Sequence, residues 1–436
     1  MSSTPETAPT ALGPAPFTPR AVRRATAAGA LGNLIEYYDF SVYSYVAVVI
    51  APQFFPSGNP AASLLAVLAV YGTAFVARLF GGLFFGWLGD KAGRRTALVS
   101  SVICMGAGAS VTGMLPTYAQ IGVLAPILLL IARLVQGFST GGEAAGSITY
   151  VYESAPPRRR AVLGAWNYFG SNLGFVVSAA ATGLVFALTT KAQMSAWGWR
   201  IPFFAAIPLT LICLWARLRL EDSPEFVAAA KKSQLPAAPI REALATHRKP
   251  MAQVLGVTIA QGGCTFLALT YVNIYLSQQL HYDTTHVQWL SALAVLAGVT
   301  LMLPAGWLAG RFGSRGVLMA GFAALLAAVY PLMMLMDQHN LALAGVAYVL
   351  LMAGCALVQA PVASLYPSLF PGRVRFSGMA IGYNLGTVLA GGTSPFIAAY
   401  LVNSTGNLLA PAYFVMTVCV VGILTLLTIR KAQLTR

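Results

Sequence analysis

The sequence predicts an all-α integral membrane protein in which twelve transmembrane helices form two homologous six-helix bundles. Three observations predict this fold: an apolar composition, twelve apolar stretches and an internal repeat. Hydrophobic residues make up 57% of the 436 residues, charged residues make up only 9%, and the mean hydropathy is +0.71. About a quarter of the residues of a typical soluble domain are charged. This composition therefore excludes a soluble enzyme, a disordered chain and a secreted disulfide scaffold, and it requires a lipid bilayer as solvent.

The first element is an N-terminal tail, residues 1–24, which opens with a run rich in Ala, Pro, Thr and Ser. It lacks the basic start and apolar run of a signal peptide, and we expect a disordered cytoplasmic segment. Twelve apolar stretches follow, each about the 20 residues that a spanning helix needs. The expected helices lie at residues 25–50, 62–88, 97–115, 121–150, 161–189, 200–220, 251–279, 287–309, 316–336, 341–365, 376–402 and 410–430.

The distribution of Lys and Arg predicts the orientation of these helices. Of the 27 Lys and Arg residues, 23 fall in tails and alternate connections on one side, and only Lys191 falls on the other. Basic residues accumulate on the cytoplasmic side of membrane proteins. We therefore expect both termini and the connection 221–250 to lie in the cytoplasm, with the chain in a bacterial inner (plasma) membrane. The same distribution accounts for most of the net charge of +15, so no nucleic-acid partner is expected.

The long connection separates two bundles. After the N-terminal tail, the chain is expected to consist of an N-terminal bundle (25–220), a cytoplasmic linker (221–250), a C-terminal bundle (251–430) and a short cytoplasmic tail (431–436). Three segments recur in the same order in both bundles, namely 86–95 with 306–315, 156–160 with 371–375, and 170–174 with 382–386. This order indicates two homologous halves. Such repeats are typical of secondary transporters, whose substrate site lies between the halves near the middle of the membrane.

Other chemistries leave no pattern in the sequence. All five cysteines fall within apolar stretches without a Cys-x-x-Cys pair, so neither a disulfide framework nor a zinc site is expected. The four histidines lie in loops, and there is no catalytic triad or phosphate-binding loop. We therefore expect no enzyme activity, no cofactor and no ATP-driven transport, and a protein that functions as a monomer.

Four segments carry a resemblance to a known family: residues 32–40 (GNLIEYYDF), 133–143 (RLVQGFSTGGE), 197–203 (WGWRIPF) and 370–375 (FPGRVR). Together with the loop segment 86–95, they resemble the metabolite:proton symporters of the major facilitator superfamily. That family includes carriers of α-ketoglutarate, citrate, shikimate and proline/betaine. The resemblance spans both halves, and it implies the major facilitator fold and proton-coupled symport by alternating access. It does not imply a particular substrate.

The chain departs from the family's pattern at several positions. Tyr37 stands where the family often has Trp, and Leu79 stands where it often has Pro. Gly310 takes the place of an acid in the second copy of the loop segment, and Ser368 stands where the first half has Glu153. The cytoplasmic latch of the second half is therefore expected to be weaker or built differently.

Five charged residues lie within the apolar stretches away from their ends: Glu36, Asp39, Arg78, Arg133 and Glu143. Each is a candidate functional residue, because a charge within the bilayer costs at least about 2–3 kcal/mol. The last six stretches contain none away from their ends. We therefore expect the first half to carry ion coupling, with its three carboxyl groups as the candidate proton carriers.

Glu36 and Asp39 are three residues apart, so they share one face of a helix. Mutual repulsion and burial both favour the protonated form of at least one of them, which suits a carboxyl that binds and releases a proton during transport. The alternative is that one of them only pairs with an arginine. Glu143 is predicted either to accept a proton on the exit path or to pair with a loop arginine as a gate.

Arg133 and Gln136 begin a polar stripe on the fourth stretch. A guanidinium there either binds a substrate carboxylate in a bidentate manner or neutralises a buried acid of the first stretch. Arg78 is either a second anion ligand or a side chain that reaches towards the cytoplasm. The candidate substrate-binding residues are Arg133, Arg78, Tyr43, Gln136, Asn172, Tyr383 and Asn384.

The resemblance also implies a cytoplasmic gate. Asp90 is expected to brace it against the other half, and Glu153 is expected to complete it with nearby arginines. The candidate gating residues are Gly86, Asp90, Gly93, Arg94, Arg95, Glu153, Arg158 and Arg373. Positive-inside charge alone accounts for the arginines, but it does not account for the two acids among them.

These residues predict proton-coupled uptake of a small polar metabolite. Two intramembrane arginines favour an organic anion, such as a mono- or dicarboxylate, as the substrate. A zwitterion such as betaine or proline is the first alternative, because aromatic rings bind quaternary ammonium groups. The residues that could form such a cage are Tyr37, Tyr38, Tyr43 and Trp166. The second alternative is a proton-antiport exporter of a metabolite or drug.

Overall fold

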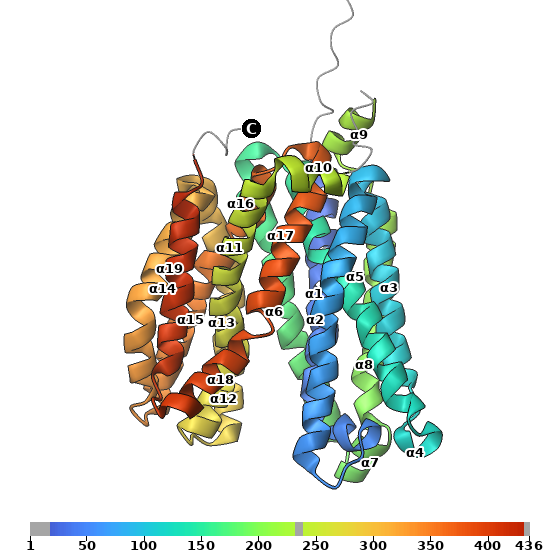
Figure 1. Ribbon diagram of the computed structural model, residues 1–436, viewed down its shortest axis with the longest axis vertical. Coiled ribbons are helices and arrows are strands. Elements are labelled where there is room, and N and C mark those ends of the chain that lie inside the picture. The colour runs from blue at the N-terminus through green and yellow to red at the C-terminus, as the bar shows by residue number, and fades with distance from the viewer. Residues whose placement is uncertain (1–17, 232–238, 431–436) are drawn as a thin grey trace, which may run out of the picture.

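The computed structural model describes residues 18–231 and 239–430, and in this part of the chain every regular element is a helix. Twelve helices are long and apolar enough to cross a membrane (Figure 1). The predicted fold class is therefore confirmed. Residues 1–17 and 431–436, which include most of the expected tails, lie outside the described residues.

The first half contains six long helices and two short ones. The long helices are α1 (Pro19–Phe54), α2 (Pro60–Lys91), α3 (Arg94–Met114), α5 (Leu124–Ser154), α6 (Arg160–Leu188) and α8 (Ile201–Leu218). The short helices α4 (Tyr118–Ile121) and α7 (Lys191–Ala196) lie in the connections between them. Helix α1 begins six residues before its predicted start, so residues 19–24 are helical and not part of a disordered tail. The Thr18 hydroxyl caps this helix by accepting a hydrogen bond from the Ala21 amide, and proline at the first helical position suits its start.

The second half also contains six spanning segments, but three of them are irregular. The regular ones are α13 (Thr284–Phe312), α14 (Ser314–Met336) and α19 (Ala410–Leu427). The irregular ones are α11 (Arg248–Phe266), which continues through two π-helical turns around α12 (Val272–Ile274), α15 (Leu341–Gln359) with α16 (Val362–Ser368), and α17 (Arg375–Ala390) with α18 (Ser394–Thr405). Apolar stretches predict all three as single helices. Pro361 breaks one of them, and Gly391 and Gly392 break another, because proline lacks an amide donor and glycine weakens a helix.

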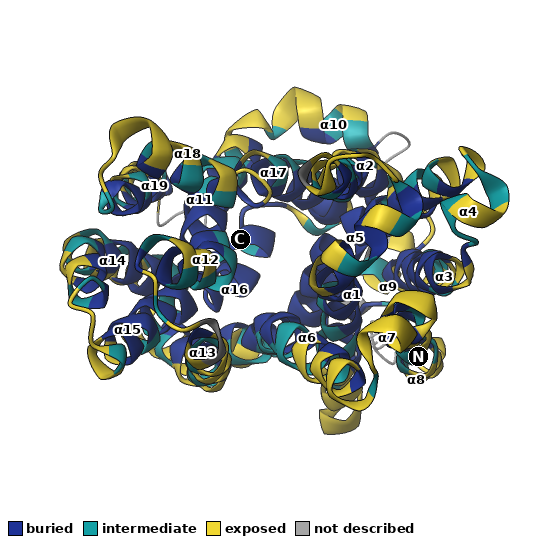
Figure 2. Ribbon diagram, turned by 90° about the horizontal axis from the view of Figure 1, so that it is seen from below, coloured by how far each residue is buried: buried dark blue, intermediate teal, exposed yellow. Residues whose placement is uncertain are grey.

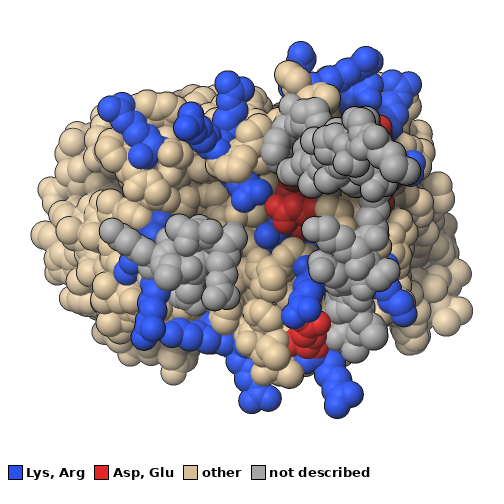
Figure 3. All heavy atoms as spheres, turned by 90° about the horizontal axis from the view of Figure 1, so that it is seen from above, with Lys and Arg blue, Asp and Glu red and all other residues tan. Residues whose placement is uncertain are grey.

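The linker contributes two further helices, α9 (Pro224–Lys231) and α10 (Pro239–Thr246), between which residues 232–238 lie outside the described part. Both helices lie at the end of the molecule where α2 is followed by α3 and α16 is followed by α17 (Figure 1). We call this end the basic end, because Lys and Arg side chains ring its surface (Figure 3).

The two halves meet along two pairs of helices. Helix α17 packs against α2, and α13 packs against α6 (Figure 2). The ribbons of the two halves touch at the basic end and diverge towards the opposite end (Figure 1). Large apolar side chains such as Leu65, Phe80, Trp289 and Phe396 are exposed on the outside, as expected for helices that face lipid.

Within the first half, α2 and α5 approach so closely that only glycine fits at their contact. A Cβ atom at Gly81 would lie 1.7 Å from the Phe138 carbonyl oxygen, and one at Gly141 would lie 2.1 Å from the Arg78 carbonyl oxygen. Small residues permit such close packing of membrane helices.

We expect Gly81→Ala to destabilise the protein, because the new methyl group would meet backbone atoms of α5 that cannot yield without moving the helix. Overpacking typically costs about 1–3 kcal/mol, which should lower the unfolding temperature of the purified protein in detergent by several degrees. Gly72→Ala, on the same helix, is the matched control, since a Cβ atom there meets nothing within 4 Å. Equal unfolding temperatures for the two variants would contradict the packing argument.

Candidate functional site

A cavity lies between the two halves. Its walls come from α1 and α6 of the first half and from α11, α15 and α17 of the second half. The polar and aromatic side chains that line it include Tyr37, Tyr168, Asn172, Gln261, Thr265, Gln359 and Tyr383. All of its lining residues are among those that the structure describes, and none of them is Asp, Glu, Lys or Arg. The cavity is therefore polar and aromatic but carries no charged side chain.

A pair of amides joins the halves at the wall of this cavity. The Asn172 Nδ2 atom donates hydrogen bonds to the carbonyl oxygen of Tyr168, at 2.8 Å, and to Gln359 Oε1, at 3.2 Å. Asn172 belongs to α6 and Gln359 ends α15, so the second bond connects the two halves. The structure thus places Asn172 and Tyr383, two of the predicted substrate ligands, on the cavity.

Arg78 lies next to the cavity but is not part of its lining. Its Nη1 atom is 3.0 Å from Glu36 Oε1, and its Nε atom donates a hydrogen bond to Asn384 Oδ1 at 2.9 Å. Asn384 in turn donates to the Gly141 carbonyl oxygen at 2.8 Å. The Arg78 guanidinium also lies 5.6 Å from the centre of the Tyr383 ring. Arg78 therefore pairs with Glu36 and links the two halves through Asn384.

Arg133 lies inside the first half, away from the cavity lining. Its guanidinium carbon is 3.6 Å from the centre of the Tyr43 ring, and its Nη1 atom is 3.9 Å from Asp39 Oδ2. Gln136 Nε2 donates a hydrogen bond to Asp39 Oδ1 at 2.9 Å. The three guanidinium nitrogens of Arg133 are buried and have no hydrogen-bond partner among the described protein atoms. The acid and the arginine thus neutralise one another only at a distance, more loosely than Glu36 and Arg78 do. The roles of Arg78, Arg133, Tyr43, Gln136 and Asn384 as substrate ligands stay predictions, and none of these residues is among those that line the cavity.

Glu143 pairs with an arginine that the charge count assigned to a connection. Arg217 lies in α8 and is completely buried, and its Nη1 atom donates hydrogen bonds to Glu143 Oε2, at 2.6 Å, and to the Leu98 carbonyl oxygen, at 2.7 Å. Ser101 donates a further hydrogen bond to Glu143 at 3.0 Å. Gly32 makes room for this pair, since a Cβ atom there would lie 2.0 Å from Arg217 Nη2. The carboxylate is thus fully engaged within the first half.

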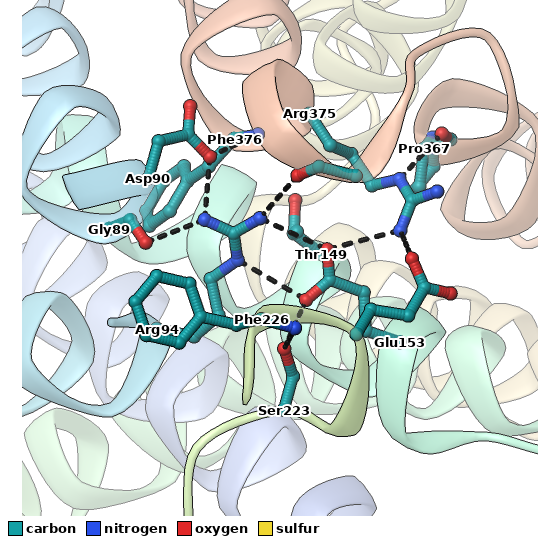
Figure 4. A network of polar contacts seen from close by, with 12 residues as sticks. Gly89, Asp90, Arg94, Thr149, Glu153, Ser223, Phe226, Pro367, Arg375 and Phe376 are labelled. Carbon is teal, nitrogen blue, oxygen red and sulfur yellow. Dashed lines mark hydrogen bonds and ion pairs between the residues drawn. The ribbon is translucent and has the colours of Figure 1, made fainter. Parts of the chain in front are cut away.

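At the basic end, Asp90 of α2 caps a helix of the other half. Its Oδ2 atom accepts a hydrogen bond from the Ser377 amide at 2.8 Å, and its Oδ1 atom accepts one from the Phe376 amide at 3.3 Å. These amides belong to the first turn of α17, where helices leave N–H groups without acceptors and favour negative charge. Arg94 Nη1 holds the same carboxylate at 2.5 Å (Figure 4).

Glu153 joins two arginines from different halves in the same network. Arg94 donates to its two oxygens at 3.2 and 3.1 Å, and Arg375 Nη1 donates to Oε1 at 3.0 Å (Figure 4). Arg94 also donates to the Gly372 carbonyl oxygen of the second half at 2.7 Å. Asp90, Arg94 and Glu153 thus form one buried network that joins the two halves at the basic end.

The other predicted gating residues lie around this network. Gly86 lets α2 approach α17, since a Cβ atom there would lie 3.0 Å from Ser377 Cα, and Gly93 adopts a φ of 105° that favours glycine. Arg95 donates its amide to Asp222 Oδ1 and its side chain to the Leu218 carbonyl oxygen, so it does not bridge the halves. Arg373 pairs with Glu242 of the linker at 2.7 Å, and Arg158 is exposed.

Comparison with known proteins supplies the family. The sequence profile of the Major Facilitator Superfamily matches residues 29–382 and, separately, residues 254–435. The chain belongs to the Major Facilitator Superfamily. It is 38% identical to the glycine betaine/proline/ectoine/pipecolic acid transporter OusA of Dickeya dadantii, over 93% of this chain and 82% of OusA. It is 37% identical to the proline/betaine transporter of Escherichia coli K12, over 94% of this chain and 84% of that protein.

Solved structures agree with the major facilitator fold. The proton:xylose symporter XylE superposes with a TM-score of 0.79 at 16% identity, over 94% of this chain and 95% of XylE. The human organic anion transporter MFSD10 gives a TM-score of 0.66, also at 16% identity, over 93% and 99% of the two chains. At this identity the likeness shows the fold alone. The family match and the named relatives, together with the twelve candidate spans, show that the protein is a multi-pass membrane transporter of the major facilitator type and not an enzyme.

Sequence reasoning missed four residues that contact the predicted site residues or one another. Arg217 is counted with the basic residues of the connection after the predicted stretch 200–220, although its place four residues after Cys213 on that stretch was a usable signal. Arg375 falls in the internal repeat and in a family segment, and neither pattern marks it as a gating residue. Two linker residues, Ser223 and Glu225, contact Glu153 and Arg375 respectively. Polar residues in a loop give no signal of which buried charge they will meet.

We expect Glu153→Gln to open the basic end, because Arg94 and Arg375 would remain buried without their shared counter-charge. Losing one partner of a buried ion pair is strongly destabilising. The rate at which an impermeant maleimide labels a cysteine introduced at Ala363, buried at this end, should rise at least about ten-fold, equivalent to about 1.4 kcal/mol. The background would carry Cys104→Ser, since Cys104 is half-buried.

Glu242→Gln provides the matched control for this experiment. It makes the same chemical change in an ion pair whose Arg373 side chain is 54% exposed, and exposed pairs contribute only about 0–1 kcal/mol. Its labelling rate should therefore stay close to that of the parent protein. Indistinguishable rates for Glu153→Gln and Glu242→Gln would show that the buried network does not hold the basic end closed.

Proposed function

We propose that the protein takes up a small zwitterionic osmolyte, such as proline or glycine betaine, in symport with protons. The observation that carries this proposal is the absence of any charged side chain among the residues lining the cavity between the halves. A zwitterion brings no net charge to such a site. A dicarboxylate would bring two negative charges without a counter-charge, and buried charges of that kind are costly.

The arginines that favour an organic anion in the sequence face acids of the first half and are not among the residues that line the cavity. Arg78 pairs with Glu36, and Arg133 faces Asp39 and the Tyr43 ring. The named relatives support the same choice of substrate, since OusA and the Escherichia coli protein are transporters of betaine and proline by name. The organic-acid prediction is therefore the weaker of the two.

An aromatic cage for the ammonium group fits the cavity, although its members differ from those predicted. Tyr37, Tyr168 and Tyr383 line the cavity from three helices. Of the other predicted members, Tyr38 donates its hydroxyl to the Pro202 carbonyl oxygen, and Tyr43 lies under Arg133. Trp166 is not among the lining residues. Aromatic faces attract ammonium groups with about 0.5–2 kcal/mol each.

Asp39 is the better candidate for the coupling proton. Its carboxylate has one hydrogen bond, from Gln136, and its arginine lies 3.9 Å away, whereas Glu36 lies 3.0 Å from Arg78. A loosely compensated carboxylate is the easier one to protonate in a membrane interior. Asp39 is two residues from Tyr37 on α1, so its charge state acts on a helix that lines the cavity.

The direction of transport follows from orientation. If the basic end faces the cytoplasm, as the Lys and Arg distribution predicts, then the network of Asp90, Arg94 and Glu153 closes the cytoplasmic side. The structure would then be the outward-facing state, in which an importer receives its substrate.

We expect proteoliposomes with an inward proton gradient to accumulate proline and glycine betaine but not α-ketoglutarate or citrate. Tyr383→Leu should raise the KM for glycine betaine by roughly 2- to 30-fold, since one aromatic face is lost. Tyr383→Phe is the control, because it keeps the ring. Accumulation of a dicarboxylate in place of the zwitterions would restore the organic-anion prediction, and efflux alone would indicate an exporter.

A second expectation concerns the proton. Asp39→Asn should abolish gradient-driven accumulation while leaving exchange of labelled for unlabelled substrate, because the amide cannot carry a proton across the membrane. Asp283→Asn, at an exposed helix cap where asparagine also accepts the His286 amide hydrogen bond, is the matched control. If Asp39→Asn proteoliposomes still concentrate substrate in response to the gradient, the proton is carried elsewhere.

A further inference from the structure

The orientation of the Asn172 side chain is fixed by its partners. Its amide nitrogen faces the Tyr168 carbonyl oxygen at 2.8 Å, and a carbonyl oxygen can only accept. The side chain therefore cannot be turned over, which would set two acceptors against one another. The same nitrogen donates to Gln359 Oε1 at 3.2 Å, so Gln359 is fixed as well.

This arrangement leaves one acceptor and one donor free beside one another on the cavity. Asn172 Oδ1 and Gln359 Nε2 are buried and have no hydrogen-bond partner among the described protein atoms. Both residues line the cavity, and their side chains are only 1% and 2% exposed. Buried polar atoms of this kind are costly unless a partner satisfies them.

We propose that this amide pair recognises a zwitterion at both of its charged groups: Asn172 Oδ1 accepts a hydrogen bond from the substrate's ammonium N–H, and Gln359 Nε2 donates one to its carboxylate. The proposal rests on the uptake of zwitterions proposed above and adds a specificity to it. A substrate with an N–H group, such as proline, satisfies both atoms. A fully methylated ammonium satisfies only Gln359.

The expected consequence is a preference for amino and imino acids over their fully N-methylated counterparts. A site that is built to bind an N–H group discriminates against an analogue that lacks it, because the acceptor is then left unpaired. A hydrogen bond that involves a charged group changes affinity by about ten-fold or more. The tyrosine faces do not make this distinction, since they attract both kinds of ammonium group.

An unpaired hydroxyl of the cavity does not select for a substrate N–H group. The Thr265 hydroxyl also lacks a partner, but a hydroxyl rotates to donate or to accept and so does not select for an N–H group. Asn172 Oδ1 can only accept. The selectivity is therefore assigned to Asn172, with Gln359 as the carboxylate donor on the opposite half.

Proline and proline betaine (N,N-dimethylproline) form the test pair, because they share the ring and the carboxylate and differ only at nitrogen. The KM for uptake of each would be measured in proteoliposomes of the full chain, and the readout is the ratio of the two values. Asn172→Leu keeps the side-chain volume and removes the acceptor. Gln359→Met removes the bond between the halves and keeps the Asn172 acceptor, whose orientation is still set by the Tyr168 carbonyl oxygen. Asn403→Leu makes the same asparagine-to-leucine change at an exposed position of α18 and is the matched control.

In the parent protein and in Asn403→Leu, the KM for proline should be at least about ten-fold lower than that for proline betaine. Asn172→Leu should reduce this ratio at least about ten-fold, whatever its effect on the absolute rates. Gln359→Met should retain most of the ratio, because both substrates carry the carboxylate that loses its donor. An unchanged ratio in Asn172→Leu would overturn the proposal. An equal loss of the ratio in Gln359→Met would also overturn it, since the effect would then belong to the bond between the halves.

Two further outcomes keep the two proposals apart. If the parent protein takes up neither compound, the proposed function fails and the specificity fails with it. If the parent protein takes up both with equal KM, only the specificity fails. This second comparison needs no variant, so it overturns the proposal even where Asn172→Leu does not fold.

Discussion

The neutralisation of charge inside the bilayer is the constraint on which the rest of this structure depends. The acids of the first half face three arginines across helix contacts: Glu36 with Arg78, Asp39 with Arg133, and Glu143 with Arg217. Each pair offsets charges that would otherwise be costly in lipid. Because these charges pair with one another within the first half, the polar lining of the cavity between the halves consists of aromatic rings, hydroxyls and amides.

The two halves therefore differ in chemistry. The first half holds the three buried ion pairs, and the second half contains irregular helices that place neutral side chains on the cavity, with π-helical turns after α11 and a break between α17 and α18. The departures at Gly310 and Ser368 agree with this division. At the basic end, the closing network takes its acids from the first half, while the second half contributes Arg375 and the amides of α17.

The sequence was sufficient for the number and order of the helices, because a 20-residue apolar stretch has few other structures available in lipid. It was also sufficient to place Asn172 and Tyr383 between the halves, since the internal repeat marks equivalent helices. It could not say which neighbour a buried charge would meet. Residue spacing defines a face of one helix, whereas the partners of Arg133 and Glu143 depend on how α1, α5 and α8 pack.

The cap that Asp90 provides for α17 ties closure of the basic end to hydration. When the two halves separate there, the amides of Phe376 and Ser377 lose the only carboxylate that the structure gives them, and backbone donors without acceptors are costly in a dry crevice. Water must therefore reach the first turn of α17 as the halves part. The space that opens at this end is therefore filled with water as soon as it forms. An intermediate in which the halves have separated but the first turn of α17 is still dry is disfavoured.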